Sequence, residues 1–435
     1  MATEVSMGKE KMMGAKILSK AHVKPKKPIG RRECQLVTYD LHYIGFQYIQ
    51  KLLVYKGSDF EDRMERLKDG LGVVLGEFNQ LAGKLGKDGD GVLRVEYDDD
   101  MDGVEVAAAT AEQIEIADLI EEESACKLKN LVPYNGILNA EGLHSSTTVG
   151  SSVMGCAFNH AIVDGTSMWH FMSSWAEICN GSQTISVPPF LDRIKARNTR
   201  VKLNLPISSS SDIINLDPPL RMKIFKFSES AIDKIKAKAN SNPNPSDGSK
   251  PISAFQSLST HLWRAVTRAR NLKPKDTTAF CVSANCRHRV DPPMPAGYFG
   301  NLIQGIVTGT SAGVLTENPP GFGAGMIQKA IEMHDAEAVD VRCRTWESNP
   351  RIMEWKDAGV NCVAVGSSPR FAVYDVDFGW GKPVIVRSGS NNRFDGMVYM
   401  HQGRSGGRSV DVDISLEASA MENLEKDEEF LGAMA

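Results

Sequence analysis

FNHAIVDGTSMWHF, residues 158–171, joins a predicted strand to a predicted helix through a short turn. The run SVMGCAFN, residues 152–159, is mostly apolar and is typical of a buried strand. Thr166 or Ser167 can cap the helix that follows. Four apolar residues of that helix share one face: Trp169, Met172, Trp175 and Ile178. The stretch therefore predicts that His160 ends a buried strand and that Asp164 lies in the turn.

The pair of His160 and Asp164 has two interpretations when it is taken alone. HxxxD occurs by chance in many proteins, and such a histidine can simply be a core residue near an acid. A metal site would need a third ligand, and no other histidine or cysteine is spaced to supply one. A catalytic role suits the surroundings better, because a strand end before a tight turn at Gly165 can hold an imidazole rigidly for general-base work.

Composition excludes several classes of protein. The chain has 435 residues, 42% of them apolar, and a net charge of −4, so it lacks the basic excess expected of a nucleic-acid-binding protein. No run of about 18 apolar residues predicts a membrane span. The eight cysteines form no CxxC pair, which argues against structural zinc and favours a reduced, cytosolic compartment. The basic residues 1–32 are expected to form a solvated leader and first strand, with a transit or anchor role as the alternative.

Predicted helices and strands alternate along the rest of the chain. Helices are expected at residues 60–85, 168–179, 252–270 and 323–338. Strands are expected at residues 92–97, 105–108, 279–284, 302–308, 360–366, 371–376, 395–400 and 409–415. The segment 198–221 is rich in serine and proline and is expected to be a crossover between two halves. The chain is therefore predicted to be an α/β protein with an N-terminal half, 1–197, and a C-terminal half, 222–435.

Two further segments combine charge with turn-forming residues. YDVDFGWGKP, residues 374–383, contains DFG, but the glycine-rich loop and HRD of a kinase are absent. Its glycines around Trp380 indicate either a loop shaped to present an indole or backbone amides, or a tight turn around a core tryptophan. NCRHRVDPPMPAGYFGNLI, residues 285–303, supplies Arg287 and Arg289, either of which could pair with Asp377.

Together these motifs resemble those of the plant BAHD acyltransferases. HAIVDG matches the HxxxDG signature of that family, DFGWG matches its second signature, and PPMPAGYFGN resembles its proline-rich bend. The two signatures stand about 215 residues apart in the family's order, and the resemblance runs from about residue 15 to about residue 430. It implies a chloramphenicol-acetyltransferase-like fold of two α/β domains with a tunnel between them. It also implies a monomer of plant specialised metabolism that binds no metal or resident cofactor and uses acyl-CoA as co-substrate.

The resemblance assigns roles to individual residues. It implies that His160 deprotonates an alcohol or amine as this attacks the thioester, without an acyl-enzyme, and that the oxyanion donor lies near Trp380. It gives Asp164 and Asp377 structural roles at the reaction centre, each paired with an arginine, and it pairs Asp377 with Arg287. The glycines of the two motifs are expected to shape the loops: Gly165, Gly379 and Gly381.

Three substrate contacts are also implied by resemblance. Arg370 stands where shikimate hydroxycinnamoyltransferases use an arginine to bind the acceptor's carboxylate, although a surface arginine is the alternative. Ser253 opens a helix near the expected acyl-CoA site and is equally suited to be a plain N-cap. Asn301, in the Gly-Asn pair, is also expected on the acyl-CoA side.

The sequence departs from the family pattern before His160. The segment LHSSTTVGSSVMGCAFNHA lacks about eight residues of the strand and hairpin that relatives carry there, and Asn285 replaces a common aspartate. A hydroxycinnamoyl donor is the first expectation and an aliphatic acyl donor the second. An acyl-CoA-binding pseudoenzyme, inactivated by the shortened strand, and a BAHD-like lyase are the alternatives. A condensation domain is disfavoured because Asn159 replaces the first histidine of HHxxxDG.

Overall fold

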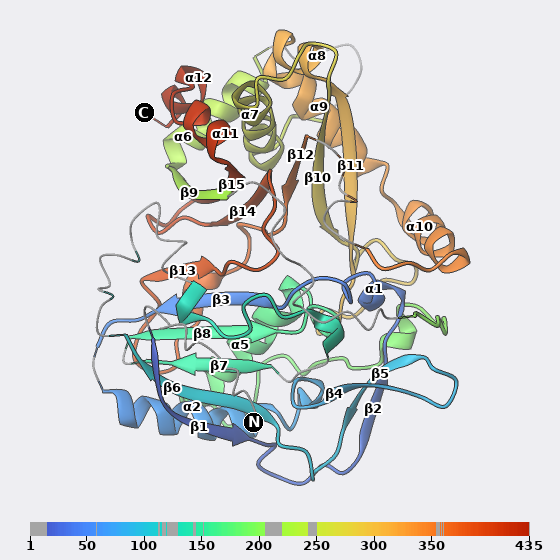
Figure 1. Cartoon of the computed structure of the whole chain (residues 1–435), viewed down its shortest axis with the longest axis vertical. Coiled ribbons are helices and arrows are strands. Elements are labelled where there is room, and N and C mark those ends of the chain that lie inside the picture. The colour runs from blue at the N-terminus through green and yellow to red at the C-terminus, as the bar shows by residue number, and fades with distance from the viewer. Residues whose placement is uncertain are drawn as a thin grey trace, which may run out of the picture.

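Two six-stranded sheets, one in each half of the molecule, make this an α/β protein of two domains (Figure 1). A three-stranded sheet lies to one side of the N-terminal half. The computed structural model describes residues 15–434 except for residues 58, 112–113, 115–118, 120–128, 142–144, 151, 205–219, 242–249, 354–356, 358 and 360. Most of the predicted crossover, including Ser208 to Ser211, lies outside the described residues.

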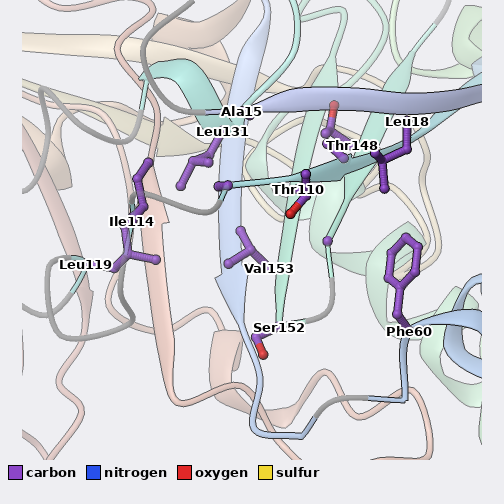
Figure 2. A pocket seen from close by; sticks show the side chains of 13 residues that line it. Ala15, Leu18, Phe60, Thr110, Ile114, Leu119, Leu131, Thr148, Ser152 and Val153 are labelled. Carbon is purple, nitrogen blue, oxygen red and sulfur yellow. The ribbon is translucent and has the colours of Figure 1, made fainter.

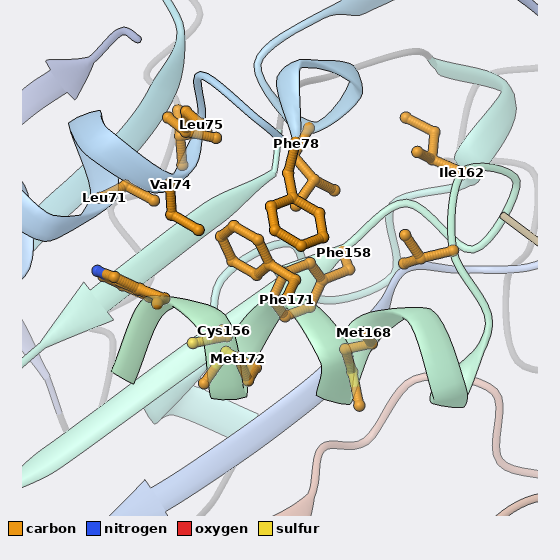
Figure 3. Close-up of a cluster of buried hydrophobic side chains, with 14 of the residues drawn as sticks. Leu71, Val74, Leu75, Phe78, Cys156, Phe158, Ile162, Met168, Phe171 and Met172 are labelled. Atoms are coloured by element: carbon orange, nitrogen blue, oxygen red, sulfur yellow. The ribbon is translucent and has the colours of Figure 1, made fainter. Parts of the chain in front are cut away.

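The N-terminal sheet carries the strand that ends at His160. Its strands, in spatial order, are β1 (Lys16–Val23), β6 (Val104–Thr110), β7 (Ser146–Val149), β8 (Val153–Phe158), β3 (Ile49–Val54) and β13 (Ile385–Ser388). Helices α2 (Phe60–Val74) and α5 (Gly165–Cys179) pack against each other and against this sheet. Figure 3 shows the aromatic centre of this core, where Phe171 contacts Phe78 and Phe158 at ring-centroid distances of 5.5 and 5.9 Å.

The C-terminal sheet has its own core. Its strands, in spatial order, are β11 (Ile303–Ser311), β10 (Thr277–Asn285), β12 (Cys362–Val365), β14 (Met397–Gln402), β15 (Val410–Glu417) and β9 (Leu220–Phe227). The helices of this half are α6 (Glu229–Ala239), α7 (Ala254–Ala269), α8 (Ala312–Glu317), α9 (Pro320–Glu332), α11 (Ala418–Leu424) and α12 (Glu428–Gly432). Trp263 of α7 is fully buried among them, and its indole N–H donates to the Thr278 hydroxyl at 2.9 Å.

Shorter elements complete the fold. The three-stranded sheet consists of β2 (Arg32–Gln35), β5 (Leu93–Tyr97) and β4 (Lys84–Lys87). Helix α1 (Thr38–Leu41) lies against α10 (Ala336–Ser348), so the start of the chain contacts the C-terminal half.

Element boundaries differ from the predictions where capping and glycine intervene. The helix predicted to extend to residue 85 ends at Val74, and the chain turns at Gly76 before a 3₁₀ helix at Asn79–Leu81. The helix predicted at 323–338 is two helices, because Asp335 caps the start of α10 with its side chain. The strand predicted at 371–376 is wrong, since Val373–Asp375 forms a 3₁₀ turn.

The C-terminal half contributes one strand to the N-terminal sheet. β13 pairs antiparallel with β3, from Ile385 opposite Val54 to Ser388 opposite Lys51. Figure 1 shows β13 beside β3 in the N-terminal half, although it follows the C-terminal half's β12 in the chain. This strand therefore lies beyond the predicted crossover at 198–221 in the chain and yet belongs to the N-terminal sheet, so it ties the two halves together.

The shortened segment before His160 keeps its strand pairing. β7 has four residues, yet it pairs parallel with β6 and antiparallel with β8, from Ser146 opposite Ala157 to Val149 opposite Met154. β8 pairs with β3 along its whole length. A largely apolar cavity of about 350 Å³ adjoins the short β7–β8 turn and is lined by residues such as Val153, Thr148 and Phe60 (Figure 2). A cavity thus lies at the far end of β8, while the strand itself keeps both of its neighbours up to the end that precedes His160.

Position 155, in the middle of β8, is expected to accept only glycine. A Cβ there would stand 2.1 Å from the carbonyl oxygen of Leu131, so Gly155→Ala must shift this backbone and is expected to destabilise the protein by about 1–3 kcal/mol. Gly325→Ala on α9 is the matched control, because its Cβ would meet nothing within 4 Å and a helical alanine should stabilise by up to about 1 kcal/mol. Thermal unfolding of both variants checks this, and equal melting temperatures would contradict it.

Candidate active site

His160 lies on the wall of a narrow cavity between the two halves. It follows β8 after one residue, Asn159, and precedes the N-terminus of α5. The cavity, of about 80 Å³, is lined from both halves by residues that include Tyr43, Lys51, His160, Ser283, Phe371 and His401. The structure therefore places the histidine in a cavity that both halves line.

Contacts with three other residues hold His160 in place. Its ring stacks on the Tyr43 ring at 4.3 Å between centroids, with 8° between the planes. Its backbone N–H donates to Asn139 Oδ1 at 2.9 Å, and its carbonyl accepts from Asn301 Nδ2 at 2.8 Å. Burial lowers the pKa of His160, and the nearby Asp164 charge and Asn301 only partly offset it. The imidazole is therefore neutral near pH 7, which is the form that accepts a proton.

Asp164 is turned away from the cavity and clamps the turn to the other half. Its carboxylate receives two hydrogen bonds from the Arg287 guanidinium, at 2.8 and 3.0 Å, and one each from the backbone N–H groups of Ser167 and Leu302. Both charged side chains are buried. Burial alone would raise the pKa of Asp164, but the Arg287 charge and these hydrogen bonds lower it. These contacts support the predicted structural role of Asp164 and Arg287. The prediction that Thr166 or Ser167 caps the helix is wrong, because Asp164 is the N-cap of α5.

Gly165 has a steric role beside this clamp. A Cβ at Gly165 would stand 3.0 Å from the Phe371 ring, which also lines the cavity. The glycine therefore lets the ring of the C-terminal half close against the start of α5.

The predicted pairing of Asp377 with Arg287 is wrong. Arg287 is occupied by Asp164, and Asp377 instead accepts from the backbone N–H groups of Gly379 and Gly381 at 2.8 and 2.9 Å. Both glycines have φ near +100°, a conformation that favours glycine. Asp377 therefore organises its own loop. Arg289 does not pair with it either, since its guanidinium donates to the carbonyls of Ile331 and His334.

Trp380 does not reach the cavity that contains His160. Its ring stacks on Phe378 and lies under the guanidinium groups of Arg63 and Arg66 at 5.3 and 5.7 Å from its centroid. These contacts fix the DFGWG loop against α2 in the N-terminal half. The expectation that the oxyanion donor lies near Trp380 is not met, because the loop carries an ordinary packed indole.

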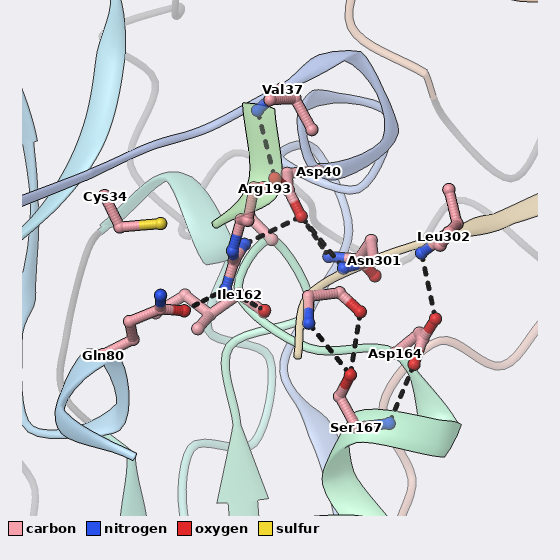
Figure 4. Close-up of polar contacts among 12 residues, drawn as sticks. Cys34, Val37, Asp40, Gln80, Ile162, Asp164, Ser167, Arg193, Asn301 and Leu302 are labelled. Atoms are coloured by element: carbon pink, nitrogen blue, oxygen red, sulfur yellow. Dashed lines mark hydrogen bonds and ion pairs between the residues drawn. The ribbon is translucent and has the colours of Figure 1, made fainter. Parts of the chain in front are cut away.

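A second buried ion pair, which the sequence did not reveal, supports the other side of the turn (Figure 4). Arg193 donates to Asp40 Oδ1 at 2.8 Å and to the carbonyl of Ile162, two residues after His160, at 2.7 Å. Burial alone would lower the pKa of Arg193, but the charge and hydrogen bond of Asp40, together with Cys34 and Tyr298, raise it. Asp40 Oδ1 also accepts from the backbone N–H and side-chain amide of Asn301. Asp40 and Arg193 are separated by 153 residues, and neither stands in a recognisable motif, so only the fold brings them together.

The three predicted substrate contacts lie in different places. Asn301 is completely buried, and its side-chain amide donates to the His160 carbonyl. It therefore positions the histidine, and the predicted contact of Asn301 with acyl-CoA is wrong. Ser253 caps α7 in a capping box with Gln256, and its contact with acyl-CoA stays a prediction. Arg370 is exposed, beside the segment whose Gly366, Ser367 and Phe371 line the cavity, and its contact with a carboxylate likewise stays a prediction.

The two-domain fold, with a half-buried histidine on the wall of the cavity between the halves, is the arrangement expected of an acyl-CoA-dependent acyltransferase. The model of the Transferase family matches residues 13–431. The chain is 56% identical to the BAHD acyltransferase DCR of Arabidopsis thaliana, over 96% of this chain and 93% of that protein. The chain therefore belongs to the BAHD family and is an acyl-CoA-dependent acyltransferase. The alignment with DCR spans 449 positions, more than this chain's 435 residues, so the relative contains residues that this chain lacks.

Two more distant proteins extend the comparison. The chain is 30% identical to a hydroxycinnamoyl-CoA:5-hydroxyanthranilate N-hydroxycinnamoyltransferase of Avena sativa, over 83% of this chain and 85% of that protein. The crystal structure of TRI101 from F. sporotrichioides, complexed with coenzyme A and T-2, has the same fold with a TM-score of 0.71 at 18% identity, over 92% of this chain and 98% of that one.

Two negative findings apply to the part of the chain that the structure describes. Within residues 15–434 and outside the gaps given above, no three histidine, cysteine or acidic side chains gather in a way that could hold a metal ion. Over the same residues, no helix is long and apolar enough to cross a membrane.

Asp164→Asn is expected to destabilise the protein by about 3 kcal/mol or more, because it leaves the buried Arg287 charge unpaired. It should also lower activity, since the turn that carries His160 loses its tie to the C-terminal half. Asp233→Asn is the matched control, because the Asp233–Arg408 pair is about half exposed and should cost less than about 1 kcal/mol. Chemical unfolding and initial rates on both variants give the comparison, and equal losses of stability would contradict a special role for the buried pair.

Proposed function

We propose that this protein transfers an acyl group from acyl-CoA directly to a hydroxyl or amine of a small-molecule acceptor, with His160 as the general base. The observation that carries the proposal is the position of His160, whose ring stacks on Tyr43 on a cavity wall shared by both halves. A free alcohol is a poor nucleophile at neutral pH, so its attack on a thioester needs a base at this position.

The contacts of His160 support the following mechanism. The imidazole takes the proton of the acceptor as its oxygen or nitrogen attacks the thioester carbonyl, and the imidazolium returns a proton to the departing coenzyme A thiolate. Because the base acts on the acceptor itself, the reaction passes through a ternary complex and needs no acyl-enzyme. Since Trp380 is packed elsewhere, the donor that stabilises the oxyanion has to come from the polar groups that line the cavity.

The size of the cavity restricts how the substrates bind. Its volume of about 80 Å³ accommodates the reacting ends of the two substrates but not their whole bodies.

A hydroxycinnamoyl donor is our first proposal, supported by the transferase of that donor class at 30% identity. An aliphatic acyl donor is the second. A monomer that acts in the cytosol, with Arg370 at the rim binding an acidic acceptor and Ser253 near acyl-CoA, completes the proposal.

The pseudoenzyme alternative depended on the loss of a strand beside His160. The continuous pairing of β8 with β3 and β7 supports an active enzyme, since the strand that positions the histidine keeps both neighbours. The lyase alternative has no observation in its favour, because the site keeps the base that a transferase needs.

His160→Ala is expected to reduce turnover by about 10²–10⁴-fold, since it removes the general base. Wild type and variant are assayed with p-coumaroyl-CoA and palmitoyl-CoA against shikimate, quinate, glycerol, a fatty alcohol and spermidine, by thiol release and by product mass. His22→Ala, at an exposed histidine of β1, serves as the control and should leave the rate unchanged. Thermal stabilisation by acyl-CoA without turnover in the wild type would favour the pseudoenzyme.

The lowered pKa of His160 predicts the pH below which the enzyme loses activity. Only the neutral imidazole can accept the acceptor's proton, so kcat/KM should fall as the pH drops through the pKa of the folded protein. Because burial lowers that pKa, the midpoint is expected below 6.5, the ordinary value for histidine, with full activity at neutral pH. Rates measured from pH 4.5 to 8 in buffers of constant ionic strength test this, and a midpoint at or above 7 would contradict the burial argument.

A further inference from the structure

A buried lysine lines the same cavity as His160, although the mechanism above does not use it. Lys51 is in the middle of β3 and is 6% exposed. Its Nζ donates to the Ser388 hydroxyl of β13 at 2.8 Å and lies 5.6 Å from the centre of the Tyr399 ring. The Ser388 hydroxyl is in turn 3.2 Å from His401 Nε2 of β14. Strands from both sheets thus converge on one ammonium group.

The charges around Lys51 leave it without a carboxylate partner among the described residues. Asp413 is bound in a bidentate pair by Arg393, at 2.9 and 2.6 Å. Asp411 faces Arg387 at 3.6 Å. Each buried acid of β15 is therefore matched by its own arginine, and the Lys51 ammonium is a surplus cation. An ammonium group has three donors, and Ser388 uses one of them.

The surroundings of Lys51 disfavour its charged form. Burial, and then the Arg393 charge, lower the pKa of Lys51 to about 7, with Asp413 acting in the opposite direction. Burial also lowers the pKa of His401, which the charges of Lys51, Arg387 and Arg393 lower further. His401 is therefore neutral and can orient the Ser388 hydroxyl. A negative charge placed beside Lys51 would remove the mismatch.

We propose that Lys51, Ser388 and His401 form a carboxylate-binding subsite, in which the Lys51 ammonium pairs with an acidic group of one of the two co-substrates. The subsite rests on the proposed function, because it selects a substrate for the reaction at His160. A carboxylate at the end of an acyl chain or on a small acceptor is compact enough for the cavity of about 80 Å³ that Lys51 lines, whereas the nucleotide of coenzyme A is too bulky for it.

Strand register gives the distance between the subsite and the base. Lys51 pairs with Cys156 across β3 and β8, four residues before His160. At about 3.3 Å per residue this separates their Cα atoms by about 13 Å along the strand. The Lys51 ammonium and the His160 imidazole thus enter the cavity from different points along the sheet, and the acid can come from either the acceptor or the far end of the acyl chain.

Matched pairs of acidic and neutral probes test the subsite and identify the source of the acid. Dissociation constants are measured by calorimetry for glutaryl-CoA against valeryl-CoA, and for shikimate against methyl shikimate with coenzyme A present. In Lys51→Met the acidic member of one pair should bind about ten- to hundredfold more weakly, because a charge-assisted hydrogen bond is lost, while the neutral members are unchanged. The pair that responds shows whether the acid belongs to the donor or to the acceptor.

Further variants separate the subsite from a structural role of Lys51. Lys51→Arg keeps the charge and should restore part of the preference, and Ser388→Ala should weaken it without removing the charge. Lys56→Met, at an exposed lysine just after β3, is the matched control and should change nothing. At pH 8, acid binding to wild type should take up a proton, seen as a difference in heat between HEPES and Tris, and this uptake should vanish in Lys51→Met.

Two outcomes would overturn the subsite. One is equal binding of acidic and neutral probes in wild type and in Lys51→Met. The other is loss of the preference for acidic probes in Arg370→Gln but not in Lys51→Met, which would show that Arg370 binds the carboxylate. Failure of the proposed function is distinguishable, because wild type would then show no turnover that depends on His160, whether or not it binds the CoA esters.

Discussion

The buried ion pair of Asp164 and Arg287 is the interaction on which the catalytic turn depends. Asp164 comes from the N-terminal half and Arg287 from the C-terminal half, and neither charge reaches solvent. A buried charge without its partner costs several kcal/mol, so the turn adopts this conformation only when both halves are in place. The ion pair thereby couples the docking of the halves to the geometry of His160, four residues before Asp164.

Around this pair, the backbone near His160 is held from several sides. Asn139 binds its N–H, Asn301 binds its carbonyl, and Arg193 binds the carbonyl of Ile162. Asp40 then joins Asn301 to Arg193, so one carboxylate links the two supports. The side chain is fixed mainly by stacking on Tyr43. Polar groups thus position the backbone, while a flat contact leaves an edge of the imidazole available to the cavity.

Local chemistry explains what could be predicted from the sequence. The apolar run before His160 and the capping signals around residues 164–167 and 253–256 act over a few residues, so β8, α5 and α7 lie close to their predicted positions. The two halves followed from the alternation of strands and helices. The position of His160 at a cavity between them followed from its place at a strand end and from the family motifs.

Long-range pairings explain what could not be predicted. Asp377 was expected to pair with an arginine, but its carboxylate accepts hydrogen bonds from two backbone N–H groups of its own loop. Arg287 pairs with Asp164 instead. Trp380 carries a motif signature and yet serves packing, because the loop faces α2. Nothing near Lys51 in the sequence marks it, since its partners on β13 and β14 are more than 300 residues away. The same strand exchange that brings β13 into the N-terminal sheet places Ser388 opposite Lys51. The cavity's electrostatic character is therefore a product of topology: two acids of β15 are neutralised by arginines of the C-terminal half, and the unmatched cation comes from the N-terminal half.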